Sequence, residues 1–242
     1  MASRQIPNHI SQQFDNELNN LRSHVLTMGG LVEDHLAKVL DALANSDSEL
    51  AEYVATNDYR VNALEVEIDE ECTGILLRRQ PAAGDLRLVL AVSKTITDLE
   101  RIGDEVEKVG RLALELTGVE RPKAYYVGIL AMGNSVKLML HDVLDAFARM
   151  DSQAAFEVAK QDLVVDEQND AIMRQLITYM MEDPRSISQV LNAVLAVRAF
   201  ERVGDHANNI GEYIIYFVEG KDVRHTSLED IDKEFKFSSN NT

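Results

Sequence analysis

Hydrophobic residues recur at intervals of three and four along most of the chain. From Phe14 to Leu43 the apolar positions keep this spacing without interruption, and a second stripe, from Leu86 to Ala113, includes several small residues. Such a spacing places side chains on one face of an α-helix, and stripes of this length are typical of long helices packed at shallow angles. No segment shows the sustained alternation of a β-strand. The pattern therefore predicts an all-α fold.

Proline marks the limits of these helices. Three of the four prolines, Pro81, Pro122 and Pro184, separate long proline-free stretches. Because proline breaks a helix interior but is tolerated in the first turn, these positions favour helix boundaries. We predict six helices, over residues 11–45, 48–79, 85–116, 123–150, 152–181 and 187–218.

The second half of the chain repeats the first. Met28-Gly29 recurs 104 residues later as Met132-Gly133. Beyond the proline turns the spacing becomes 101, and it aligns the run from Glu100 to Asp104 with the run from Glu201 to Asp205. A length change of three residues in a loop, with the register kept on both sides, indicates a duplicated unit.

The duplication predicts two tandem three-helix bundles, over residues 10–118 and 119–220. Residues 1–9 are expected to form a flexible N-terminus, and the charged segment 221–242 is expected to be largely disordered. Gly29 and Gly133 lie in mid-helix at matched positions, although glycine costs about 1 kcal/mol there relative to alanine. Close approach of a neighbouring helix, or a shared kink, would explain both glycines.

The chain is strongly acidic. It has 41 Asp and Glu residues against 24 Lys and Arg residues, which gives a net charge of −17 at pH 7. Such a charge repels phosphodiester backbones and anionic membrane surfaces. The composition therefore argues against nucleic acid as a partner and favours cations or basic surfaces of other proteins.

No segment is predicted to insert into a membrane. The longest apolar runs are short, and residues 190–200 include Asn192 and Arg198. The N-terminus lacks the apolar stretch of a secretory signal. The single cysteine, Cys72, excludes an internal disulfide and a thiolate metal cage, and its apolar neighbours at helical spacing predict a core thiol. These features indicate a cytoplasmic protein.

Two pairs of acids lie beside the apolar stripes at matched positions. Glu100 and Asp104 are one helical turn apart, as are Glu201 and Asp205. Like charges at this spacing disfavour a helix by a few tenths of a kcal/mol. A pair that occurs in both halves suggests that something positive relieves the repulsion.

The middle helix of each half offers further acids. Asp162 and Asp166 are one turn apart, and the corresponding positions in the first half are Asp58 and Asn62. If the second and third helices of a bundle are antiparallel, these rows meet the acid pairs. Several oxygen atoms would then converge on a site for a hard or borderline cation.

Salt bridges are the alternative explanation. Arg101 and Arg202 follow Glu100 and Glu201 directly, and Lys108 and Arg111 lie one or two turns beyond Asp104. These side chains could supply all the positive charge that the acids need. From the residues alone, the two explanations are about equally supported.

Other chemistry finds little support. No histidine completes the Glu-x-x-His pair of di-iron carboxylate helices, because Gly103 and Gly204 follow the two glutamates at that distance. There is no phosphate-binding loop and no catalytic triad context. Two alternatives stay open: a metal-dependent phosphate-ester hydrolase that uses the repeated carboxylates, and a histidine phosphotransfer protein that uses His35, which is not duplicated because the second half has Met139 at the matching position.

The repeated Glu-Arg-(Ile/Val)-Gly-Asp run resembles the PhoU family of phosphate-signalling regulators. Further similarity lies in the segments 28–30, 79–87 and 139–147, and the resemblance extends from about Ile10 to His225. It implies a cytoplasmic, non-enzymatic adaptor, commonly a homodimer, with two related three-helix bundles. It also implies negative regulation of phosphate uptake and of the phosphate-starvation response, through the ATPase subunit of the phosphate-specific ABC transporter and a membrane sensor histidine kinase.

The resemblance also implies bound iron, zinc, magnesium or manganese ions, held by Glu/Asp-x-x-x-Asp motifs. Asn62 departs from the motif, since it has an amide where the family pattern has an acid, so these positions supply one carboxylate fewer in the first site than in the second. The positions that match or correspond to these motifs are Glu100, Asp104, Glu201, Asp205, Asp162, Asp166, Asp58 and Asn62.

Overall fold

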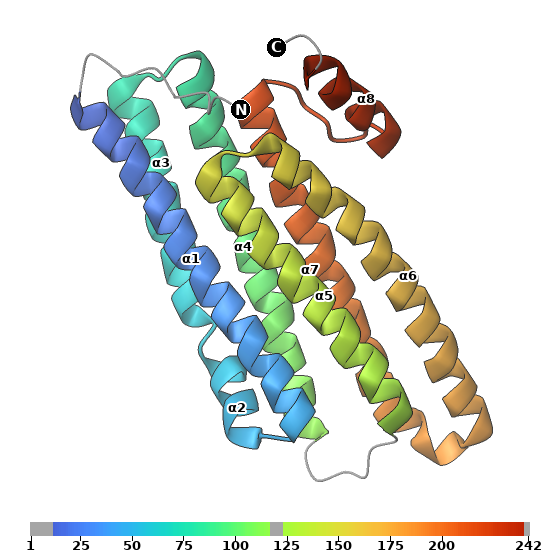
Figure 1. Cartoon of the computed structure of the whole chain (residues 1–242). Helices are drawn as coiled ribbons and strands as arrows, with labels where there is room; N and C mark the ends of the chain where they lie inside the picture. The colour runs from blue at the N-terminus through green and yellow to red at the C-terminus, as the bar shows by residue number, and fades with distance from the viewer. Residues whose placement is uncertain (1–11, 117–122, 240–242) are drawn as a thin grey trace.

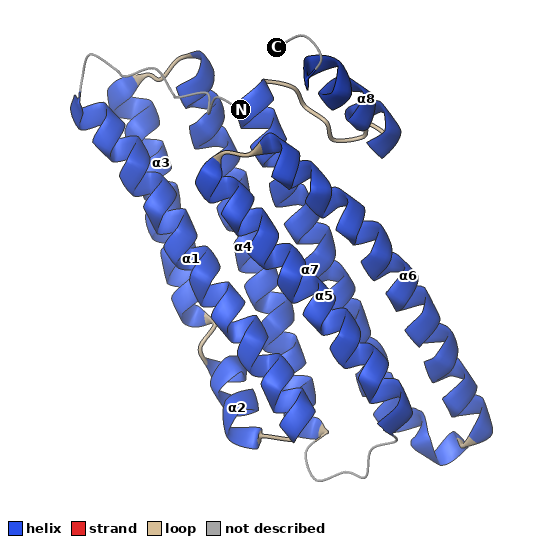
Figure 2. Ribbon diagram, viewed as in Figure 1, coloured by secondary structure: helices blue, strands red, loops and turns tan. Residues whose placement is uncertain are grey.

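The structure is a computed structural model that describes residues 12–116 and 123–239. Within these residues every regular element is helical (Figure 2). The expected flexible N-terminus and the junction between the bundles at 118–122 lie outside the described residues. The elements are α1 (Gln12–Asn45), α2 (Ser48–Thr56), α3 (Tyr59–Arg79), α4 (Ala83–Glu115), α5 (Lys123–Arg149), α6 (Ser152–Glu182), the 3-10 turn η1 (Pro184–Ser186), α7 (Ile187–Glu219) and α8 (Leu228–Ser239).

The long helices form two three-helix bundles that pack side by side (Figure 1). The first bundle contains α1, α3 and α4, and the second contains α5, α6 and α7. Helix α4 packs against α7 and α1 packs against α5, while α3 and α6 lie at the outer edges. One layer therefore has the order α3, α4, α7, α6. The prediction of two tandem repeated bundles is confirmed.

The middle helix of the first bundle is interrupted, which corrects the single helix predicted over 48–79. The break lies at Asn57 and Asp58, where the Asn57 side-chain amide donates a hydrogen bond of 2.8 Å to the Tyr53 carbonyl. A short polar side chain that bonds to nearby backbone competes with the helix. The second bundle has Gln161 and Asp162 at these positions, and because glutamine is a good helix former α6 continues through them.

The turn after the first helix of each bundle is conserved between the halves. Asp47 caps α2 by accepting hydrogen bonds from the backbone N–H groups of residues 49 and 50, and Asp151 caps α6 in the same way. The preceding residues, Ser46 and Met150, both have a left-handed backbone, with φ of 57° and 53°. A cap that satisfies the free N–H groups of a helix start fixes where the second helix begins.

The mid-helix glycines permit the two bundles to approach each other closely. A Cβ atom at Gly29 would overlap the side chain of Leu144, and one at Gly133 would overlap the side chain of Leu40. The two contacts exchange residues between matched positions of α1 and α5, as in a symmetric dimer. Close approach of a neighbouring helix, which the sequence suggested, is therefore confirmed.

A single hydrophobic core extends through both bundles. Cys72 belongs to it, with 2% of its surface exposed, and burial raises the pKa of its thiol to about 12. The thiol is therefore a core residue, as predicted. Within the described chain, α5 has the length and apolar composition that a membrane span would need, over Tyr126–Arg149. Its Met132, Val136 and Met139 are fully buried against the other helices, which is the pattern of a core helix.

The C-terminal segment is more ordered than the sequence predicted. Residues 221–242 were expected to be largely disordered, but Leu228–Ser239 forms α8, which lies against α6 at one end of the second bundle (Figure 1). Two apolar residues of the segment, Val223 and Ile231, are 5% and 6% exposed. The expectation was wrong because it was based on the charge of the segment and not on its few apolar residues. These residues become buried against α6 and α7.

Candidate metal centre

Three acids of the first bundle meet between α3 and α4. Asp58, Asp104 and Glu107 each place a carboxylate oxygen within 4.8 Å of the other two. Among the described residues, this is the one group of three potential ligand side chains that meets this distance. Separations of this size allow three carboxylates to contact one ion after small rotations. We call this set, with Glu100 and Asn62 beside it, the first cluster.

The glycine of the repeated motif makes room for the deepest carboxylate. A Cβ atom at Gly103 would lie 2.7 Å from Asp58 Oδ1, and one at Gly204 would lie 3.3 Å from Asp162 Oδ1. The first distance is shorter than a non-bonded contact permits, so only glycine fits while Asp58 keeps its position. The residue that argued against a di-iron site thus has a structural role, since it admits an acid from the neighbouring helix.

Asp58 is buried and has an unsatisfied oxygen. Its surface is 5% exposed, and its Oδ1 atom has no hydrogen-bond partner within the part of the chain that the structure describes. Burial, and then the charges of Asp104 and Glu107, raise its pKa to about 6, although a hydrogen bond from Asn62 acts in the opposite direction. A buried carboxylate oxygen without a partner is costly, and a cation would satisfy it.

Glu100 takes part in the same electrostatic environment. Burial raises its pKa first, followed by the charges of Asp104, Glu65 and Asp58. Glu65 belongs to α3, so acids from both helices influence one another across the α3–α4 contact. The sequence prediction that the middle-helix row faces the acid pair is therefore met in this bundle.

The second cluster consists of Asp162, Asp166, Glu201 and Asp205, between α6 and α7. Burial raises the pKa of Asp162 to about 7, and the charges of the other three acids act in the same direction. Burial and Asp166 also raise the pKa of Asp205. Asp166 and Asp205 are exposed and Asp162 is half-buried, so the cluster has one deep acid and a solvent-facing rim.

Glu107 was not predicted as a site residue, but the alignment of the two halves contains a signal that could have found it. At a spacing of 101 residues Glu107 corresponds to Asn208, whereas Asn62 corresponds to Asp166 at a spacing of 104. The acid that the first bundle lacks on its middle helix is therefore present on its third helix. Asn62 thus does not reduce the number of carboxylates in the first cluster relative to the second.

Salt bridges account for few of these acids. Arg202 pairs with Glu105 at 2.5 Å, and Lys108 pairs with the same residue at 2.7 Å. Arg111 pairs with Glu107. Among the described residues, no Lys or Arg ion pair within 4.0 Å involves Asp58, Asp104, Asp162, Asp166 or Asp205. The salt-bridge explanation therefore covers Glu107 and, through a 3.5 Å contact with Arg198, Glu201, but not the aspartates.

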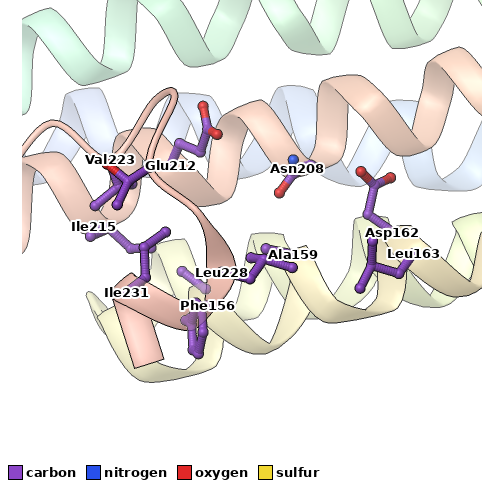
Figure 3. Close-up of a pocket in the computed structure, with 12 residues that line it drawn as sticks. Phe156, Ala159, Asp162, Leu163, Asn208, Glu212, Ile215, Val223, Leu228 and Ile231 are labelled. Atoms are coloured by element: carbon purple, nitrogen blue, oxygen red, sulfur yellow. The ribbon is translucent and has the colours of Figure 1, made fainter. Parts of the chain in front are cut away.

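A groove extends from the second cluster towards α8 (Figure 3). It has a volume of about 220 Å³, and its polar residues are Asp162, Asn208, Glu212 and Thr226. Apolar side chains, including Phe156 and Ile231, close its other end. Burial raises the pKa of Glu212, while Arg224 acts in the opposite direction. The second cluster therefore has an additional acid on its α8 side.

His35 is not placed for phosphotransfer. Its surface is 1% exposed, its ring lies edge-on to Tyr53 with 5.9 Å between ring centroids, and burial lowers its pKa. A phosphotransfer histidine must reach a partner's phosphoryl group, and this ring is enclosed by the first bundle.

Comparison with known proteins identifies relatives over nearly the whole chain. A model of the PhoU domain matches residues 25–113 and again residues 129–214. The phosphate-specific transport system accessory protein PhoU homolog of Pseudomonas aeruginosa is 50% identical over 229 residues, which cover 95% of each chain. The phosphate-specific transport system accessory protein PhoU of Escherichia coli is 47% identical over 233 residues, which cover 96% of each chain.

Two crystal structures show the same fold. The structure of PhoU from Pseudomonas aeruginosa superposes with a TM-score of 0.84 at 50% identity and covers 86% of this chain and 100% of that chain. The structure of the phosphate transport system regulatory protein PhoU from Streptococcus pneumoniae gives a TM-score of 0.81 at 30% identity, with 87% and 99% covered.

Proposed function

The chain belongs to the PhoU family, and we propose from this membership that it represses phosphate uptake and the phosphate-starvation response. Family members are accessory proteins of phosphate transport and not enzymes, so the hydrolase and phosphotransfer alternatives are set aside. The observation that carries the proposal is the double match to the PhoU domain, together with about half of the sequence in common with named transport accessory proteins.

We further propose that the protein acts as a cytoplasmic adaptor. Its partners would be the ATPase subunit of the phosphate-specific ABC transporter and the sensor histidine kinase of the phosphate two-component system, and it would act as a homodimer. The acidic surface, with a net charge of −17, supports contact with basic protein surfaces rather than with nucleic acid.

Metal binding is the second part of the proposal. The first cluster would hold an ion through Asp58, Asp104 and Glu107, with Glu100 and Asn62 adjacent, and the second cluster through Asp162, Asp166, Glu201 and Asp205. The Oδ1 atom of Asp58 supports this, since it is buried and has no hydrogen-bond partner among the described residues. Because all donors are oxygen atoms, magnesium, manganese or ferric iron fit better than zinc.

A deletion strain tests the regulatory role. Without the protein, phosphatase expression should stay high in phosphate-rich medium, and the intact gene should restore repression. Normal repression in the deletion strain would contradict the proposal. Co-purification of the wild-type protein with the transporter ATPase and, separately, with the kinase would test the two contacts.

Elemental analysis of protein purified without added metal tests the clusters. We expect a bound metal, and a rise in melting temperature when metal is added back, because ligand that binds only the folded state stabilises it. An Asp104→Asn/Asp205→Asn variant serves as the control, since it should lose both effects. An unchanged melting temperature across manganese, magnesium and iron would contradict metal binding.

A further inference from the structure

The contact between α4 and α7 contains two buried acids of α4, and each of them has a polar partner on α7. Asp98 of α4 accepts a hydrogen bond of 2.7 Å from His206 Nδ1 and one of 3.3 Å from the Asn209 amide. Glu105 of α4 pairs with Arg202 of α7 at 2.5 Å. Asp98 and Glu105 are 3% and 4% exposed. These polar contacts cross from one bundle to the other.

Each of these contacts adjoins a cluster residue in the sequence. Arg202 follows Glu201 and His206 follows Asp205, whereas Glu105 follows Asp104. Consecutive residues of a helix point in directions about 100° apart. Each central helix therefore presents cluster acids towards its outer neighbour and the cross-bundle contacts towards the other central helix.

The order of the helices in this layer allows these contacts to transmit a helix displacement from one cluster to the other. Helices α4 and α7 lie in the middle, α3 lies beyond α4 on one side, and α6 lies beyond α7 on the other. A cation in the first cluster removes the repulsion between the acids of α3 and α4, so it draws these helices together. Because buried acids are costly to separate from their partners, α7 must follow α4. Movement of α7 towards α4 is movement away from α6.

We propose that the α4–α7 pair couples the two clusters negatively, so that a cation in one weakens binding in the other. Asp98, Glu105, Arg202 and His206 act as positioning residues, since they transmit the displacement without contacting an ion. The inference rests on the metal binding proposed above and adds to it a regulatory property, namely a half-loaded state that is populated over a range of metal concentration.

A binding cycle with Mn²⁺ measures the coupling. One variant, Asp162→Asn/Asp205→Asn, reports the affinity of the first cluster alone, and Asp58→Asn/Asp104→Asn reports that of the second. For the full protein, the product of the two Mn²⁺ association constants should be at least about fivefold lower than the product of the constants measured for each cluster alone. Measurement in about 1 M salt, where the screening length is ~3 Å, suppresses direct repulsion between the ions.

Two further variants separate coupling from simple stabilisation of the fold. Glu105→Gln and Asp98→Asn should bring the product back towards the value for independent clusters, although each cluster keeps its own affinity. Glu33→Gln is the control, because Glu33 of α1 pairs with His141 of α5 at 2.9 Å, which crosses between the bundles but lies outside the α4–α7 contact. This variant removes a contact between the bundles but should leave the coupling unchanged.

The outcomes distinguish the inference from the proposal beneath it. Equal products for full protein and separate clusters, or positive coupling, would overturn the inference and leave metal binding intact. Coupling that persists in both Glu105→Gln and Asp98→Asn would also overturn it. Failure of Mn²⁺ to bind the full protein at all would overturn metal binding and the inference together.

Discussion

The two carboxylate clusters are built on corresponding positions of a duplicated bundle, but they do not place their acids at the same positions. Asn62 of the first cluster corresponds to Asp166 of the second, and Glu107 of the first corresponds to Asn208 of the second. An acid and an amide have exchanged helices. What the two halves keep in common is the number of oxygen donors around a deep aspartate, and not the residue at each position.

The charge surrounding the clusters differs more than their donors. Arg111 of the first bundle pairs with Glu107, and the corresponding residue of the second bundle is Glu212. Burial raises the pKa of Asp58 to about 6 and that of Asp162 to about 7; the Arg111 side chain opposes the rise in the first bundle, and Glu212 adds to it in the second. The comparison therefore indicates a more negative second cluster, which should bind cations more strongly at neutral pH.

Removal of ligands should have the largest effect. Asp104→Asn/Glu107→Gln should weaken Mn²⁺ binding to the first cluster by more than about 100-fold, since loss of outer partners alone costs 10–100-fold. The second cluster should change far less. Mn²⁺ titration followed by electron paramagnetic resonance measures both. Loss of all binding in this variant would show that the clusters do not form separate sites.

Substitution of the motif glycines by alanine should affect the two clusters to different extents, because the space beside each glycine differs. In Gly103→Ala the new Cβ atom would lie 2.7 Å from Asp58 Oδ1, whereas in Gly204→Ala it would lie 3.3 Å from Asp162 Oδ1. We expect Mn²⁺ affinity to fall about 10-fold in the first variant and less in the second. The added methyl group displaces the ligand carboxylate, and a displaced ligand binds more weakly, as it does when the residues that orient it are lost. Equal effects would contradict the tighter fit of the first cluster.

The pH dependence of stability should also differ between the clusters in metal-free protein. A carboxyl group whose pKa is raised in the folded state keeps a proton that the unfolded chain, with a pKa of about 3.9, releases. The free energy of unfolding therefore falls as pH rises from about 4 to the folded pKa, which is about 6 for Asp58 and about 7 for Asp162. The second cluster should thus lose stability over the wider range.

Amide variants measure this penalty directly. With chelator present at about pH 8, Asp162→Asn should raise the free energy of unfolding by about 1–2 kcal/mol after allowance for solvent screening, and Asp58→Asn by less. Near pH 4 both differences should vanish. Thermal melts across this pH range provide the measurement. Destabilisation by both variants at high pH without metal would show that the aspartates are already well paired.

The smallest effect should come from the exchange of donors between the helices. Asn62→Asp/Glu107→Asn gives the first cluster the arrangement of the second and keeps its number of carboxylates. Mn²⁺ affinity should therefore stay within about threefold of the original, a change of less than about 1 kcal/mol. Each single substitution serves as a control. Asn62→Asp alone should strengthen binding and Glu107→Asn alone should weaken it. A large loss in the double variant would show that donor position matters more than donor number.

The general fold follows from the sequence because it depends on periodicity. The unbroken stripe from Phe14 to Leu43 predicted α1, and the repeat predicted both bundles. The break at Asn57 was missed because it depends on one side chain that bonds to Tyr53, a local competition that hydrophobic spacing does not register. Helix α8 was missed because its few apolar residues need the surface of the second bundle to become buried.

Several acids of the two clusters were identified in the sequence for a similar reason. The acids of the repeated motif were found by their register, whereas Glu107 was missed because its partner across the repeat, Asn208, carries no charge. The function of Gly103 could not be read from the sequence, since it depends on how closely Asp58 approaches from α3. Contacts between helices fix such details, and one helix's sequence contains no information about them.

The reciprocal contacts of Gly29 with Leu144 and of Gly133 with Leu40 bear on the history of the chain. In a homodimer, one mutation changes both copies of such a contact at once, so the two copies cannot be altered independently. Joining the copies into one polypeptide removes that restriction. Each half can then mutate separately while the inherited packing between them persists, and the two halves are free to specialise.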